Sequence, residues 1–77
     1  MIKIMLFAHL REQMGESEFI IDSFTGSVKD LKGYLFENYA IQHLDHIMIA
    51  VNEEFCQDHT QINNGDVVAL IPPVSGG

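Results

Sequence analysis

The end of this sequence is the part best suited to chemistry. It closes on PPVSGG, so Gly76 and Gly77 carry no side chains and Gly77 ends in a carboxylate. Glycines lack Cβ, so they enter narrow channels and adopt backbone angles closed to other residues. A terminal carboxylate is an anion at neutral pH, with a pKa near 3.5, and must be activated before it can transfer its acyl group. The candidate group for chemistry at this end is therefore the carboxylate of Gly77, with Gly76 beside it, although the residue types alone do not decide whether it reacts.

The residues before the two glycines extend the reach of that carboxylate. A residue spans at most about 3.3 to 3.6 Å, so Ser75 to Gly77 place the reactive atom roughly 10 Å beyond the folded body. The pocket that acts on it must then belong to a partner, which we expect to contact Pro73, Val74 and Ser75. The alternative is a frayed terminus, because chain ends are often disordered.

Other candidate reactive side chains form no catalytic or metal-binding pattern. Cys56 and His59 have C-x-x-H spacing, but zinc generally takes three or four protein ligands and no second pair is close in sequence. His43 and His46 fall in a polar connection and are predicted to be surface residues. A single cysteine on a short strand is more often a small buried hydrophobe than a nucleophile. We predict no metal site and no catalytic thiol.

Size and charge limit the classes of protein and partner. The 77 residues predict one domain over 1–77, with 74–77 as a flexible C-terminal tail. A net charge of −7 repels phosphate backbones and anionic lipid surfaces, which argues against nucleic acid and membranes and favours a basic rim on another protein. One cysteine and no apolar stretch of membrane length favour the cytoplasm.

The first half of the chain predicts a hairpin followed by a helix. Residues 2–10 alternate as a strand with two largely apolar faces, residues 18–22 read as a second strand antiparallel to it, and Gly15 breaks the connection. The helix signal runs from Ser27, a plausible N-cap, and Asp30 favours its positive end. Its apolar stripe consists of Val28, Leu31, Leu35 and Tyr39.

The second half predicts strands again. Residues 47–51 form a third strand, residues 52–57 turn into a short edge strand, and Asn63 to Asp66 form a turn. Residues 66–71 form a last strand that is apolar on both faces, and the two prolines at 72 and 73 end its pairing.

One helix covers only one face of such a sheet. If the first and last strands are both central, an apolar patch stays exposed and marks a protein partner. We expect this patch to consist of Met5, Phe7, Val68 and Leu70. The alternative is that loops cover these residues.

The β-β-α-β-β order, the Asn-Gly-Asp turn at 64–66 and the ending ALIPPVSGG together resemble the ubiquitin-like β-grasp sulfur carriers, in particular the small subunits of molybdopterin synthases. The resemblance covers essentially the whole sequence. It implies an α+β fold, with a mixed sheet, one main helix packed on one face, and the first and last strands as parallel neighbours at the centre. Leu70 and Ile71 stand where related chains often have aromatic residues.

The resemblance also implies a chemistry for Gly77 in molybdenum cofactor biosynthesis. An E1-like adenylyltransferase would use ATP and Mg²⁺ to form an acyl-adenylate there, and sulfur from a persulfide donor protein would displace AMP and leave a thiocarboxylate. The large subunit of molybdopterin synthase would supply the active-site side chains that pass this sulfur to cyclic pyranopterin monophosphate, forming the molybdopterin dithiolene. The chain would bind no cofactor, and two small subunits would assemble with two large ones.

Three alternatives remain open at this point. The sulfur could go to thiazole synthesis for thiamine, although that branch tends towards shorter chains without the PPVS run. The same adenylated Gly77 would also serve a ubiquitin-like modifier that is joined to lysines of target proteins. A plain interaction domain with an inert tail would lose no function on truncation after Val74.

Overall fold

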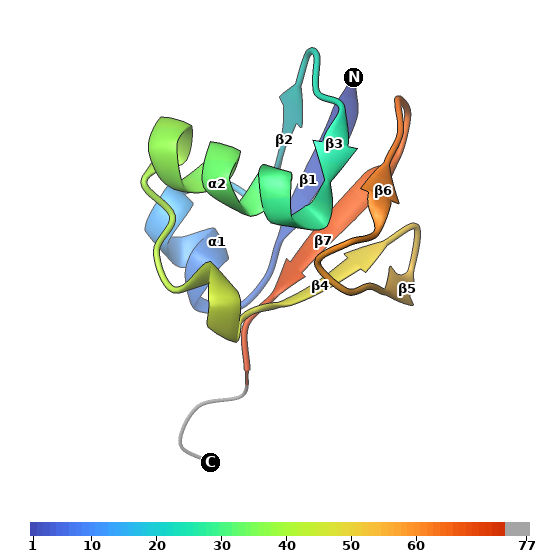
Figure 1. The fold of residues 1–77 in the computed structure, drawn as a ribbon. Coiled ribbons are helices and arrows are strands. Elements are labelled where there is room, and N and C mark those ends of the chain that lie inside the picture. Colours follow the sequence, from blue (N-terminus) through green and yellow to red (C-terminus); the bar gives the residue numbers. More distant parts are fainter. Residues whose placement is uncertain (74–77) are drawn as a thin grey trace.

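The computed structural model describes residues 1–73 (Figure 1). The residues expected to carry the chemistry, Gly76 and Gly77, and the expected partner contacts Val74 and Ser75 lie outside this described part. The elements in chain order are β1 (Ile2–Leu6), α1 (His9–Met14), β2 (Glu18–Ile21), β3 (Gly26–Ser27), α2 (Val28–Tyr39), the 3₁₀ helix η1 (Leu44–His46), β4 (Met48–Val51), β5 (Glu54–Phe55), β6 (Gln61–Ile62) and β7 (Val67–Ile71).

The main sheet has five strands in the order β2-β1-β7-β4-β5. The first strand β1 runs parallel to the last strand β7, with Ile4 opposite Val68 and Met5 opposite Ala69. On its other side β7 pairs antiparallel with β4. The sheet is therefore mixed with β7 at its centre, which confirms the predicted neighbourhood of the first and last strands. Strands β3 and β6 form a separate antiparallel pair.

The connection between β1 and β2 differs from the sequence prediction. The two strands pair antiparallel as expected, but β1 ends at Leu6 and the short helix α1 follows, where residues 2–10 had been assigned to one strand. Ala8 has a positive φ of 54°, which interrupts the extended backbone. The helix buries Leu10 in the core, and Gly15, at φ 79°, ends it by donating its N–H to the Arg11 carbonyl.

Helix α2 begins as predicted. The Ser27 hydroxyl oxygen accepts a hydrogen bond from the Asp30 backbone N–H at 3.2 Å, and the Asp30 carboxylate accepts one from the Ser27 N–H at 3.0 Å. The backbone bond from Ser27 is the main reason that the pKa of Asp30 lies below its ordinary value. This reciprocal capping box satisfies two N–H groups that a helix start otherwise leaves unpaired.

Helix α2 packs on one face of the main sheet (Figure 1). Val28, Leu31 and Leu35 are buried against the strands, as their spacing predicts, and Tyr39 packs partly buried at the edge of the core. The other core contributors are Ile2, Ile4, Leu6, Leu10, Ile21, Ile41, Leu44, Ile47, Ile49, Val51, Ile62, Val68 and Leu70. No helix within residues 1–73 has the length and apolar character needed to cross a bilayer.

The turn before β7 has the predicted geometry. Gly65 adopts φ 92°, the Asp66 carboxylate accepts a hydrogen bond from the Asn63 N–H at 2.8 Å, and the Asp66 N–H returns to the Asn63 carbonyl at 3.1 Å. Strand β7 then runs to Ile71, and pairing stops at Pro72 as expected.

Candidate functional site

The sheet has one face without a helix, which we call the open face. Side chains alternate along each strand, and paired residues point to the same side, so the pairing register identifies its members. They are Lys3 and Met5 on β1, Glu18 and Ile20 on β2, Val67, Ala69 and Ile71 on β7, Met48 and Ala50 on β4, and Phe55 on β5. Eight of these ten residues are apolar, and they come from all five strands.

Two of the four residues predicted to form the exposed apolar patch are not exposed. Val68 and Leu70 are completely buried, because they lie on the side of β7 that faces α2. Met5 is on the open face and partly exposed, and Phe7 is exposed just after the end of β1. The existence of an uncovered apolar surface was predicted, but the side of β7 that forms it was not.

The residues that the prediction missed are the most exposed ones. Met48, Phe55 and Ile20 have 51%, 65% and 44% of their surface exposed, and large apolar side chains at such exposure on one sheet face are unusual for a free-standing domain. Phe55 lies directly opposite Ala50, which is itself opposite Ala69 at the centre of the sheet. The open face is therefore continuous from the edge strand β5 to the central strand β7.

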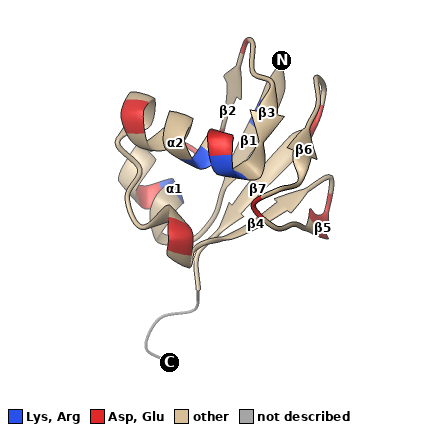
Figure 2. Ribbon diagram, in the orientation of Figure 1, with Lys and Arg blue, Asp and Glu red and all other residues tan. Residues whose placement is uncertain are grey.

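Charges on the open face are few and paired. The Lys3 ammonium lies 3.4 Å from the Glu18 carboxylate, across β1 and β2, and both side chains are about half exposed. Such exposed pairs contribute little to stability. Acidic positions are spread over α1, α2, η1 and β5 (Figure 2). Most of these acidic positions lie on the helices and not on the sheet, so a partner that covers the open face meets a mainly apolar surface.

The root of the tail lies at the end of β7. Pro72 is buried and Pro73 is exposed, so the described chain reaches the surface at Pro73. Pro73 lines a hollow of about 400 Å³ together with His9 and Gln13 of α1 and with Gln42, His43 and His46 around η1. Three of the four histidines thus gather at the point from which the tail begins.

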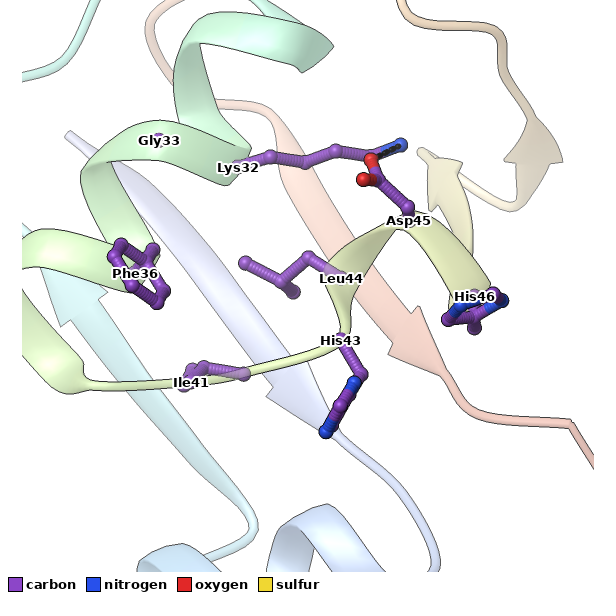
Figure 3. A pocket seen from close by; sticks show the side chains of 8 residues that line it. All are labelled: Lys32, Gly33, Phe36, Ile41, His43, Leu44, Asp45 and His46. Atoms are coloured by element: carbon purple, nitrogen blue, oxygen red, sulfur yellow. Dashed lines mark ion pairs between the residues drawn. The ribbon is translucent and has the colours of Figure 1, made fainter.

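A second hollow, of about 420 Å³, separates α2 from η1 (Figure 3). Phe36, with 58% of its surface exposed, stands at its side, and Leu44 and Ile41 are buried residues of its lining. Lys32 points across it to Asp45, with Nζ 3.9 Å from Oδ1, and donates a hydrogen bond of 2.7 Å to Asp58. That bond is the main cause of the lowered pKa of Asp58.

Cys56 and His59 show no reactive arrangement. Cys56 is half-buried, and its thiol donates to the Glu54 carbonyl at 3.2 Å. Across residues 1–73 no three His, Cys, Asp or Glu side chains lie close enough together to hold a metal ion.

Strand order, the single long helix and the uncovered sheet face define the class: this is a ubiquitin-like β-grasp protein. The structure of SAMP1 from Haloferax volcanii superimposes with a TM-score of 0.76 and 30% sequence identity, covering 99% of this chain and 98% of that one.

The model of the ThiS family matches residues 4–77, and the chain belongs to that family. A curated relative, the molybdopterin synthase sulfur carrier subunit of Anopheles gambiae, is 31% identical over 83 residues, which cover 99% of this chain and 91% of the relative. A protein-protein complex of subunits 1 and 2 of the molybdopterin-converting factor from Helicobacter pylori contains a similar chain, with a TM-score of 0.69, 28% identity and coverage of 99% and 97%.

Proposed function

We propose that this protein is the sulfur carrier subunit of a molybdopterin synthase. The observation that carries the proposal is the family match through residue 77, together with a curated sulfur carrier of similar length aligned over nearly the whole chain. The geometry agrees, because the central strand β7 leads directly to Pro73 at the root of the tail. A large subunit is the expected partner, since the similar Helicobacter pylori chain is found in a complex with subunit 2.

In this function Gly77 is the C-terminal residue and carries the sulfur. Its carboxylate oxygen attacks the α-phosphate of ATP on an E1-like adenylyltransferase that uses Mg²⁺, and pyrophosphate leaves. A persulfide sulfur then attacks the acyl carbon, AMP leaves, and thiol-dependent cleavage of the S–S bond leaves a thiocarboxylate. The large subunit would position this group against cyclic pyranopterin monophosphate. The activating enzyme, the sulfur donor and the assembly of two small with two large subunits remain predictions.

The folded body has two tasks in this scheme. The open face offers an apolar surface on which a partner gains affinity from burial, at roughly 25 cal/mol per Å² of apolar area before the costs of association. The strand β7 contributes Val67, Ala69 and Ile71 to that face and also leads to the tail. A partner held on the face therefore has a fixed position relative to Pro73. We expect Met48 and Phe55 to be the main apolar anchors, because they are the large side chains most exposed there.

The test is the intact mass of the chain after incubation with ATP, Mg²⁺, the cognate adenylyltransferase and a persulfide donor. We expect one oxygen of Gly77 to be replaced by sulfur, located by sequencing the terminal fragment, and the product to restore molybdopterin formation with the large subunit. Variants that lack Gly77 or carry one residue after it should fold normally and transfer no sulfur. Normal transfer by either variant would refute the role of the tail.

A ubiquitin-like modifier is the second candidate function, and it is favoured by the similarity to SAMP1, the small archaeal modifier protein 1 of Haloferax volcanii. The same activated Gly77 would then form amide bonds with lysines of other proteins. Lysine adducts of this chain in cell extracts, absent when Gly77 is deleted, would support that function. Thiocarboxylate formation without adducts would support the sulfur carrier alone.

A further inference from the structure

The hollow at the root of the tail differs in chemistry from the rest of the acidic chain. Its polar lining consists of His9, Gln13, Gln42, His43 and His46, and no carboxylate of the described residues takes part. Imidazole N–H and amide NH₂ groups donate hydrogen bonds. In a chain with eleven Asp and Glu against four Lys and Arg, this lining can donate hydrogen bonds to an anion and contains no carboxylate of the described residues that would repel it.

The short helix η1 arranges the donors. His46 is the last residue of η1 and His43 is its N-cap, and the ring centroids of the two histidines are 6.4 Å apart. Between them in sequence, Asp45 turns toward Lys32, whereas the two histidines point away from that ion pair (Figure 3). Asp45 lines the hollow between α2 and η1 together with both histidines, but it does not line the hollow at the root of the tail.

We propose that this hollow receives carboxylate side chains from the protein that accepts the tail. The inference rests on the proposed function, because only a protein that encloses residues 74–77 must also contact the surface around Pro73. Pro73 is part of the lining, so the docking surface continues directly into the tail. Hydrogen bonds to an ionised carboxylate are stronger than those between neutral groups.

The chemistry of the hollow also gives specificity. A partner that docks in the correct orientation places its carboxylates against the N–H groups of the hollow. In a wrong orientation, the same carboxylates face acidic surface elsewhere on the chain. The open face then supplies apolar area, and the hollow fixes the orientation of the partner around the tail.

The experiment compares paired histidine variants of the full chain. His9 and His46 are both exposed, and neither has a positive φ, whereas His43 has φ 61° and is left unchanged. We would prepare the double variants His9→Gln/His46→Gln, His9→Ala/His46→Ala and His9→Glu/His46→Glu. His59→Ala is the matched control, because His59 is exposed and does not line the hollow.

The readout is the Kd for the cognate large subunit, measured by calorimetry at one salt concentration, with thermal unfolding checked for each variant. Loss of a hydrogen bond to an ionised group corresponds to roughly a tenfold to hundredfold rise in Kd. We expect the Ala variant to bind that much more weakly, the Glu variant more weakly still, and the Gln variant and His59→Ala to stay near the wild-type Kd.

Failure of this inference can be distinguished from failure of the proposed function. Wild-type and Glu-variant chains that bind the large subunit equally well would overturn this inference and leave the proposed function intact. A wild-type chain that neither binds the large subunit nor forms a thiocarboxylate would overturn both.

Discussion

Replacing Val67 and Val68 separately with Ala tests the assignment of the open face. The two residues are of the same type and adjacent in β7, but Val68 is completely buried under α2 and Val67 is partly exposed on the open face. Any change in strand propensity is similar for both and largely cancels in the comparison. The difference between the variants therefore reports burial on the two faces.

The expected magnitudes follow from the burial. Val68→Ala removes two buried methyl groups at about 0.8 kcal/mol each and leaves a cavity, so we expect a loss of about 2 to 3 kcal/mol in the free energy of unfolding. For a domain of this size that loss lowers Tm by roughly 10 to 20 °C. Val67→Ala should cost less than about 1 kcal/mol, because its side chain is already partly in water.

Urea denaturation measures the first effect, as a shift of the midpoint at an unchanged m value. The second measurement is binding of the large subunit by Val67→Glu, which replaces an apolar side chain at the start of β7 on the open face with a carboxylate and should raise Kd at least about tenfold. Equal destabilisation by the two Ala variants, or full affinity in Val67→Glu, would refute the assignment of the faces.

Three further substitutions test the local structure. Gly33→Ala should raise the free energy of unfolding by about 0.5 to 1 kcal/mol, since a Cβ there meets no heavy atom within 4 Å; a drop in the urea midpoint would contradict this. Ser27→Ala should lower the free energy of unfolding by about 1 kcal/mol, because the hydroxyl that accepts from the Asp30 N–H is lost. Ser27→Asp keeps an acceptor at this position and should retain most of the wild-type stability. Asp58→Asn should be less stable than wild type at pH 7. The pKa of Asp58 is lowered mainly by the hydrogen bond from Lys32, so this carboxylate stabilises the fold above its unfolded-state pKa, and the effect is lost as the pH falls through the lower folded-state pKa. Urea midpoints of wild type and Asp58→Asn should converge in acid, and a gap that persists there would point to a cause other than charge.

The sequence predicted the elements well wherever a local signal was strong. The cap at Ser27, the turn at 63–66 and the stop at Pro72 each depend on a few neighbouring residues, and all three were confirmed. Helix α1 was missed because its single buried residue, Leu10, continues the alternation of β1.

The faces could not be assigned from the sequence for a different reason. Alternation separates Val67, Ala69 and Ile71 from Val68 and Leu70, but both sets are apolar, so neither is marked as the side that faces water. The register of β7 against β1 determines which set faces the core, because it places Val68 beside Ile4 and Ala69 beside Met5. The histidine hollow was beyond reach as well, since His9 and His46 meet only through tertiary packing.

In the proposed function, the strand β7 links the surface that binds the partner to the tail that carries the reacting group. It is the central strand, it supports the core with one face and the open face with the other, and the root of the tail follows it directly. In the proposed function, binding energy gained on the open face would therefore fix the position of Pro73, from which the chain continues to Gly77. Orientation of this kind is worth several kcal/mol in an acyl-transfer step, because it replaces a search in solution by a nearly unimolecular encounter. A carrier whose open face were covered would keep the same Gly77, but it would lose the means to place that residue.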